Sequence, residues 1–217
     1  MTPDSLAERV TAAVLEFGAR VDARRRRLIG IVGAPGAGKT TVTAQVVAAW
    51  PRPDDVAVLA MDGYHLSQAR LVQLGRRDRM GAPDTFDVDA FAADLEKARD
   101  IDASMLVPGF DRTREEVVPS ALTIPKDARF VLVEGNYLLH DADGWERVRP
   151  LLDGVVYLQP DDAERRARLV ARHIEFGKTP EEAEEWVARS DEANAALIAA
   201  TAHRADRILV IPPATAR

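Results

Sequence analysis

Residues 28–41 read Leu-Ile-Gly-Ile-Val-Gly-Ala-Pro-Gly-Ala-Gly-Lys-Thr-Thr, a short apolar run that leads into a glycine-rich turn. The apolar run from Leu28 to Val32 is typical of a buried strand, and residues 40–50 have the pattern of a helix. Between them, residues 33–40 fit the spacing G-x-x-x-x-G-K-[ST] at every fixed position. We therefore expect a strand, a tight turn and a helix in that order.

This turn has the chemistry of a phosphate-binding loop. Glycines let the main chain approach an anion closely, and the amides at the start of the helix point at it. The Lys39 ammonium can reach the outer phosphates, and the Thr40 hydroxyl can ligate the Mg²⁺ that accompanies ATP or GTP. A glycine-rich turn without function would not need the flanking strand and helix. The residues expected to contact the nucleotide are Gly33, Ala34, Pro35, Gly36, Ala37, Gly38, Lys39, Thr40 and Thr41.

Composition limits the class of protein. The chain has 217 residues, enough for one α/β domain with a sizeable core. The net charge of -6 gives no general attraction to nucleic acid or to acidic membranes. Cysteine is absent, which excludes disulfides, thiolate metal sites and a cysteine nucleophile. No apolar run approaches the roughly 18 residues of a membrane span, and no signal peptide is recognisable. We expect a cytoplasmic protein without nucleic-acid or membrane partners.

Asp62 follows a second apolar strand, predicted over residues 56–61. In a parallel sheet the loops after the strands face the ligand crevice, so Asp62 should lie on the same edge as the phosphate loop. An N-cap or turn role is the alternative for an isolated aspartate. Beside a phosphate loop, a carboxylate that accepts the proton of an attacking hydroxyl is the better interpretation.

Glu134 follows a third strand, predicted over residues 130–133. An acidic residue in this position, downstream of a phosphate loop, is typical of a carboxylate that holds Mg²⁺ directly or through water. We therefore assign Thr40 and Glu134 to the metal. Further strands are predicted over residues 154–159 and 207–211, which gives about five parallel strands in one sheet.

The C-terminal third is predicted to be helical. Arg165, Arg168 and Arg172 recur on one stripe of a helix over residues 162–176, and this stripe suits a lid that neutralises transferred phosphate. A solvated basic face is the alternative. A second helix should start with the capping box at Thr179 and run to about residue 202. Its inward residues should be Trp186, Ala193 and Leu197. Asp191 and Asn194 could be structural or could contact the ligand, and the structural role is preferred.

The remaining segments are an N-terminal helix and an insertion. The N-terminal helix should start at Thr2, with Pro3 in its first turn, and close on the solvated basic run of residues 24–27. Residues 62–129 look like an insertion over the crevice, with a helix over residues 88–99 and a small ribbon formed by residues 105–107 and 121–124.

The order of these motifs resembles the phosphoribulokinase/uridine kinase family of P-loop kinases, which includes bacterial pantothenate kinases. The resemblance covers residues 28–211. Residues 61–65, Met-Asp-Gly-Tyr-His, are similar to the family's strand-end motif with its general base. Residues 83–87 resemble its Pro-Asp-Ala-Phe-Asp segment, and residues 108–114 its substrate loop, with Phe110 in place of Tyr. The chain looks closest to bacterial proteins described as nucleoside/nucleotide kinases or fructose-transport-system kinases.

This resemblance implies an α/β fold: a three-layer P-loop NTPase sandwich with a mostly parallel five-stranded sheet. We expect one domain over residues 1–217, with a phosphate-loop core at 28–61, an acceptor-binding insertion at 62–129 and a lid at 161–179. The catalytic candidates are Asp62, Lys39, Arg168 and Arg172. The acceptor-binding candidates are Tyr64, His65, Asp84, Asp111 and Arg112.

The function predicted from the sequence is an ATP- and Mg²⁺-dependent kinase that phosphorylates a hydroxyl of a small polar metabolite, a nucleoside or a sugar. Three alternatives stay open: a pantothenate kinase-like enzyme, a P-loop NTPase, and a nucleotide-binding module without an acceptor. A guanine-specific Asn-Lys-x-Asp motif is absent, which disfavours a regulatory GTPase. The resemblance also leaves a homodimer as an option.

Overall fold

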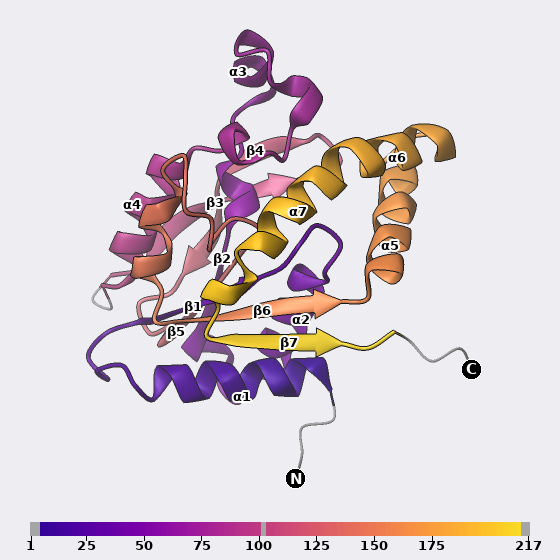
Figure 1. Ribbon diagram of the computed structural model, residues 1–217. Coiled ribbons are helices and arrows are strands. Elements are labelled where there is room, and N and C mark those ends of the chain that lie inside the picture. Colours follow the sequence, from indigo (N-terminus) through magenta and orange to yellow (C-terminus); the bar gives the residue numbers. More distant parts are fainter. Residues whose placement is uncertain (1–4, 101–102, 214–217) are drawn as a thin grey trace.

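A five-stranded parallel sheet forms the centre of the protein (Figure 1). The computed structural model describes residues 5–100 and 103–213. The strands are β1 (Arg27–Val32), β2 (Val56–Ala60), β5 (Phe130–Gly135), β6 (Gly154–Pro160) and β7 (Arg207–Ile211). Their spatial order is β2-β5-β1-β6-β7, and every neighbouring pair is parallel. The predicted α/β fold with five parallel strands is confirmed.

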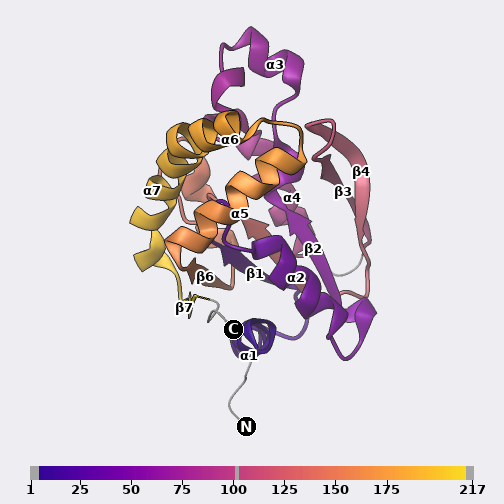
Figure 2. The same cartoon turned by 90° about the vertical axis from the view of Figure 1, so that its right-hand side faces the viewer.

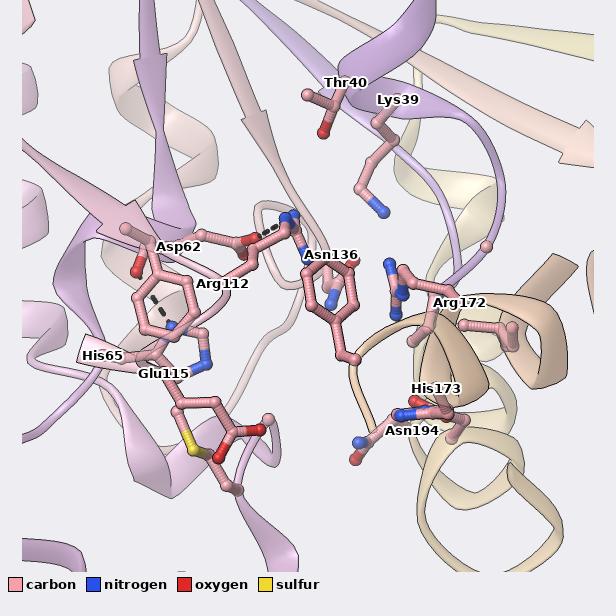
Figure 3. A pocket seen from close by; sticks show the side chains of 18 of the residues that line it. Lys39, Thr40, Asp62, His65, Arg112, Glu115, Asn136, Arg172, His173 and Asn194 are labelled. Atoms are coloured by element: carbon pink, nitrogen blue, oxygen red, sulfur yellow. Dashed lines mark hydrogen bonds and ion pairs between the residues drawn. The ribbon is translucent and has the colours of Figure 1, made fainter. Parts of the chain in front are cut away.

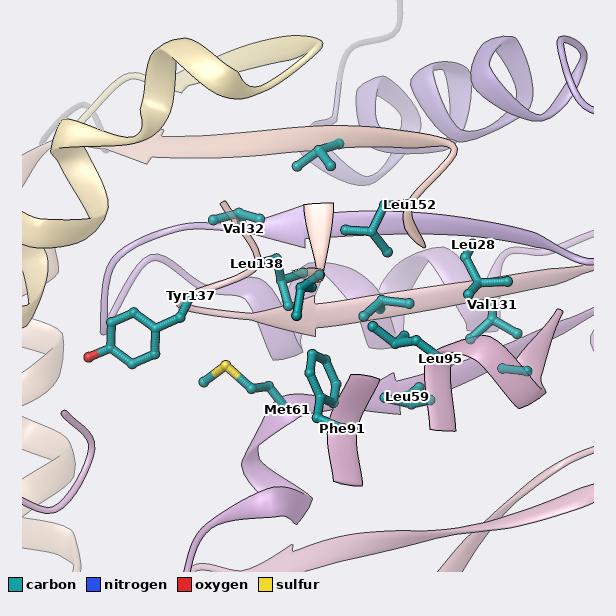
Figure 4. Close-up of a cluster of buried hydrophobic side chains, with 14 of the residues drawn as sticks. Leu28, Val32, Leu59, Met61, Phe91, Leu95, Val131, Tyr137, Leu138 and Leu152 are labelled. Carbon is teal, nitrogen blue, oxygen red and sulfur yellow. The ribbon is translucent and has the colours of Figure 1, made fainter. Parts of the chain in front are cut away.

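Helices cover both faces of this sheet and create two hydrophobic cores. On one face, α1 (Leu6–Gly18) and α2 (Lys39–Ala48) pack on the sheet through Phe17 and Val46, against Ile31 and Leu158. On the other face lie α4 (Val88–Ala98) and the segment after β5. Figure 4 shows the second core, in which Phe91 and Leu95 of α4 meet the strand residues. Burial on both faces explains why β1 and β5 are continuous apolar runs.

A long antiparallel hairpin stands beside β2. It is formed by β3 (Met105–Asp111) and β4 (Glu116–Ile124), and it is longer than the predicted ribbon. Most of β4 is exposed, so its polar and apolar residues do not show the pattern of a buried strand. The short helix α3 (Gln68–Gln73) projects from the same side of the molecule (Figure 2). These elements belong to the segment 62–129.

The C-terminal helices arch over the carboxyl edge of the sheet (Figure 1). They are α5 (Asp162–Glu175), α6 (Pro180–Trp186) and α7 (Glu192–Ala200), with a π-helical turn, Val187–Asp191, between α6 and α7. The predicted inward face is wrong after this turn: Ala193 and Leu197 are exposed, and Asn194 and Ile198 are buried instead. A π turn adds one residue to the helical repeat, which moves the buried face by one position.

The N-terminal region differs from the prediction in two ways. The proposed start at Thr2 and Pro3 lies outside the described residues, and α1 is capped by Ser5 with Glu8 in a capping box. Helix α1 also ends at Gly18, well before the basic run. Within that run Arg26 is fully buried, and its guanidinium donates to main-chain carbonyls that include those of Ala98 and Ala128, each at 2.9 Å. This arginine joins loops at the amino-terminal side of the sheet and is not a solvated cation.

Candidate active site

The phosphate loop lies at the end of the central strand β1, directly before α2. Gly36 and Gly38 have φ angles of 77° and 85°, in the region that favours glycine. A Cβ on Gly36 would meet the Arg165 carbonyl oxygen at 2.7 Å, whereas one on Gly38 would meet nothing within 4 Å. Gly36 is therefore needed for close packing on α5. Gly38 leaves the approach to the start of α2 open.

Lys39 lies over the phosphate loop. Its ammonium donates to the carbonyls of Gly33 and Ala34 at 2.8 and 3.1 Å. Burial lowers the pKa of Lys39 to about 8, although the carboxylates of Asp62 and Glu134 oppose this shift. A phosphate bound in the loop would raise the pKa of Lys39 again, because its negative charge favours the ammonium form.

Glu134 and Thr40 meet at the same edge of the sheet. Strand β5 is paired with β1, so the end of β5 lies beside the phosphate loop. The Thr40 hydroxyl donates to Glu134 Oε1 at 3.1 Å. Within the described chain, the buried Glu134 Oε2 has no hydrogen-bond partner. Burial, and then repulsion by Asp62, raise the pKa of Glu134. A carboxylate oxygen without a partner, beside a threonine hydroxyl, fits a Mg²⁺ ion that arrives with a nucleotide.

Asp62 lies in the turn that follows β2, the strand paired with β5 (Figure 3). Its Oδ2 accepts a hydrogen bond from Arg112 at 2.7 Å, and its main-chain oxygen is 2.9 Å from His65 Nδ1. Burial alone would raise the pKa of Asp62. The positive charge of Arg112 and smaller contributions from His65 and Lys39 outweigh burial, so the pKa is held below its ordinary value. The carboxylate is therefore ionised at neutral pH.

The arginines of α5 divide into two groups. Arg168 and Arg172 line the cavity, and Figure 3 shows Arg172 opposite Asp62. Burial lowers the pKa of Arg172. Arg165 is buried away from the cavity, where it pairs with Asp162 at 2.9 Å and Glu192 at 2.5 Å. The three arginines predicted to share one face of the helix therefore differ in role. Arg165 is structural, whereas Arg168 and Arg172 face the cavity.

One cavity of about 400 Å³ brings most of the predicted residues together. Its lining includes Pro35, Gly36, Gly38, Lys39, Thr40, Thr41, Asp62, His65, Arg112, Glu134, Arg168 and Arg172. Gly33, Ala34 and Ala37 belong to the same loop and lie behind this surface. The cavity therefore extends from the phosphate loop to Asp62 and onward between the hairpin and the C-terminal helices.

Three predicted acceptor residues do not line this cavity. The Tyr64 hydroxyl donates to Asp94 at 2.8 Å inside the second core. Asp84 forms ion pairs with Arg79 at 2.6 Å and Arg76 at 3.2 Å. Asp111 accepts the main-chain N–H groups of the hairpin turn. Each of these side chains already has a structural partner, which sequence spacing alone does not reveal.

Several lining residues were not predicted from the sequence. Asn136 lies two residues after Glu134, and this strand-end position could have indicated it. Asp191, on the π turn, contacts His173 at 2.8 Å, and Asn194 lies beside them (Figure 3). Both Asp191 and Asn194 were interpreted as structural, because the π turn that directs them inward has no clear sequence signal. Further lining residues are Arg77, Met80, Glu115, Phe176, Lys178 and Trp186.

Fold and site together define a phosphotransferase of the P-loop class. Residues 28–216 match the phosphoribulokinase/uridine kinase family. The chain belongs to this family of small-molecule kinases, as its motifs suggested, and the family implies the use of a nucleotide. Among the residues that the structure describes, no helix is long and apolar enough to cross a membrane.

Individual relatives carry different names. A Schizosaccharomyces pombe protein named "Putative uridine kinase C227.14" is 33% identical over 181 residues, which cover 79% of this chain and 77% of that protein. The Escherichia coli protein YggC is 30% identical over 192 residues, 87% of this chain and 79% of YggC. A crystal structure from Silicibacter sp. TM1040, described as a "putative fructose transport system kinase", has a TM-score of 0.82 and 33% identity. The match covers 94% of this chain and 98% of that one.

Proposed function

We propose that the protein transfers the γ-phosphoryl group of ATP, in a Mg²⁺-dependent reaction, to a hydroxyl of a small polar metabolite. One observation carries this proposal: the ionised carboxylate of Asp62 shares a cavity with Lys39 of the phosphate loop. A protein that only binds nucleotides would not need a carboxylate in this position. The segment 62–129 would contribute the acceptor side, and residues 161–179 would form the lid.

The phosphate side would hold and orient the nucleotide. Main-chain amides of residues 33–41 would bind the β- and γ-phosphates, and the Lys39 ammonium would turn from its loop carbonyls toward them. Thr40 and Glu134 would hold the metal. When bound there, the metal would supply positive charge that offsets the negative charge of the phosphates.

The acceptor side would supply the base. The acceptor oxygen attacks the γ-phosphorus, its proton passes to a carboxylate oxygen of Asp62, and the bond from the γ-phosphorus to the bridging oxygen breaks, which releases ADP. Arg168 and Arg172 would approach the transferred group from α5 and stabilise its negative charge. His65 would line the acceptor pocket beside Asp62.

A nucleoside or a sugar is the proposed acceptor. Polar side chains on the wall opposite Asp62, those of His173, Asp191 and Asn194, suit a compound with several hydroxyls. Phe110 lines the pocket where the resemblance places a tyrosine of uridine kinases, so a nucleobase would lose one hydrogen-bond partner. The relatives' names support both classes of acceptor. The lack of cysteine is consistent with the reducing cytoplasm as the place of reaction.

An acceptor panel tests this proposal. ADP release from Mg-ATP would be measured with nucleosides, pantothenate, ketoses, aldoses and sugar acids, and the phosphorylated product would be identified by mass. We expect one acceptor class to raise the rate well above the rate without acceptor. High ADP release that no acceptor changes would contradict the kinase assignment and favour an NTPase.

A further inference from the structure

Arg112 forms an ion pair with Asp62, the proposed base. Its guanidinium is 2.7 Å from Asp62 Oδ2, and both side chains line the cavity (Figure 3). The pair is partly shielded from solvent, with exposed side-chain fractions of 40% for Arg112 and 31% for Asp62. A charge-assisted hydrogen bond of this length occupies a lone pair of the base. In this arrangement Arg112 stabilises the ionised carboxylate and takes one of its proton-accepting positions, so Asp62 is a weaker base toward a hydroxyl or water.

The local fold holds the main chain of Arg112 in place. A Cβ on Gly63 would meet the Pro108 carbonyl oxygen at 2.5 Å, so the glycine after Asp62 allows β3 to approach the turn. The turn between β3 and β4 is fixed by Asp111, which accepts the N–H groups of Thr113 and Arg114. These contacts place the main chain of the hairpin turn, and with it Arg112, beside Asp62.

A second cavity could accommodate the Arg112 side chain when it leaves Asp62. A space of about 530 Å³ lies between the hairpin turn and the junction of α5 and α6, and Arg112 lines both cavities. The two elements face each other in Figure 2. The second cavity is also lined by Glu182 and Glu185 of α6. These two carboxylates would attract a guanidinium that leaves Asp62, and the cations Arg114, Lys178 and Arg189 in the same lining would oppose them. The second cavity therefore offers Arg112 a polar space of mixed charge.

We propose that Arg112 is a positioning residue that masks Asp62 until an acceptor displaces it, and so suppresses hydrolysis of the nucleotide by water. The inference rests on the proposed role of Asp62 as the base. With the mask removed, water would attack the γ-phosphorus, its proton would pass to Asp62, and the bond to the bridging oxygen would break to give ADP and inorganic phosphate. With the mask in place, the acceptor must first separate the ion pair.

The test uses the full chain with Mg-ATP and no acceptor. Release of inorganic phosphate is compared among the wild type, Arg112→Met, and the double variant Arg112→Met/Asp62→Asn. Because a general base contributes about 10²- to 10⁴-fold, we expect Arg112→Met to raise hydrolysis at least ~10-fold. The double variant should return to the wild-type rate, because the additional hydrolysis passes through Asp62.

Arg114→Met is the matched control. Arg114 lies on the same turn and lines only the second cavity, with an exposed side-chain fraction of 82%. Its replacement should leave basal hydrolysis unchanged. Arg112→Lys serves as a second variant in case Arg112→Met does not fold, because the shorter ammonium side chain holds the carboxylate less well and should also raise hydrolysis. Circular dichroism would verify that each variant is folded.

The outcomes separate this inference from the kinase assignment. Basal hydrolysis that stays at the wild-type rate in the folded Arg112 variants would overturn the masking role, and so would an increase that persists without the Asp62 carboxylate. Transfer to uridine and D-fructose is measured in parallel with wild-type and Asp62→Asn protein. Asp62→Asn could lose transfer while Arg112→Met shows no increase in basal hydrolysis. That result would support the kinase assignment and overturn only the masking role of Arg112.

Discussion

The two sides of the cavity are built in different ways. The phosphate side is one continuous stretch at the end of the central strand, and its loop offers mainly main-chain groups. The acceptor side is assembled from side chains such as Asp62, Arg112 and His173, which come from three separate parts of the chain. In the proposed function the phosphate side would bind a group common to all nucleotides, whereas individual side chains of the acceptor side would determine the substrate. We therefore expect variants to separate nucleotide binding from transfer.

The largest effect expected on the phosphate side comes from Lys39. Lys39→Ala should lower the rate of phosphoryl transfer about 10²- to 10³-fold, because it removes a cation directed at the transferred group. Steady-state kinetics with a responsive acceptor would measure this loss. Arg77→Ala, which removes a lining cation that already pairs with Glu115, is the control and should affect transfer far less. An equal loss of transfer rate in both variants would contradict a special role of Lys39 on the phosphate side.

The metal assignment gives the next effect. Glu134→Gln keeps the shape of the side chain and removes its charge, so the Mg²⁺ concentration for half-maximal activity should rise about 10- to 100-fold. A magnesium titration at saturating nucleotide measures this change. An unchanged titration curve would show that the Glu134 carboxylate does not serve the metal.

The glycines of positive φ should differ in their effect on stability. Gly36→Ala should lower the free energy of unfolding by about 2 kcal/mol, since the new Cβ meets the main chain of α5. Gly177→Ala, at φ 99° and with nothing within 4 Å, should cost only about 1 kcal/mol from backbone strain. Urea denaturation compares the two variants. A smaller loss for Gly36→Ala than for Gly177→Ala would argue against the close packing of the loop on α5.

The smallest predicted effect is a pH dependence. The pKa of Lys39 is lowered to about 8, so its ammonium is charged below pH 8 and loses its proton above it. Nucleotide affinity should therefore fall about 10-fold per pH unit above pH 8, and binding near pH 8 should take up protons. Isothermal titration calorimetry in buffers of different ionisation enthalpy detects this uptake. Binding without any proton uptake between pH 8 and 9 would contradict the lowered pKa.

The contrast between the two sides also explains what the sequence could predict. The phosphate loop and the strand-end positions of Asp62 and Glu134 follow from local pattern, because parallel strands bring their carboxyl ends to one edge. Tyr64, predicted for the acceptor pocket, instead donates a hydrogen bond to Asp94. No rule of sequence spacing indicates this contact. Asn194 lines the site because a π turn displaces the helical face by one residue.

Buried charge was equally hard to predict. Arg26 belongs to a run of four arginines that looks solvated, yet it donates hydrogen bonds to loop carbonyls in the interior. Only the path of those loops shows that a cation is needed there. The same holds for Arg165, which shares a helix stripe with Arg172 but pairs with Glu192 on α7. Tertiary partners, and not residue type, distinguish these arginines.

The most direct test of Asp62 as the base compares the wild type with the Asp62→Asn variant in two properties, nucleotide affinity and transfer rate. Wild-type and variant protein would be titrated with Mg-ATP, and transfer to the best acceptor of the panel would be measured under the same conditions. We predict that the dissociation constant of Mg-ATP stays within a few-fold of the wild type, while transfer falls about 10²- to 10⁴-fold. Transfer at the wild-type rate in Asp62→Asn would contradict the assignment of Asp62 as the base.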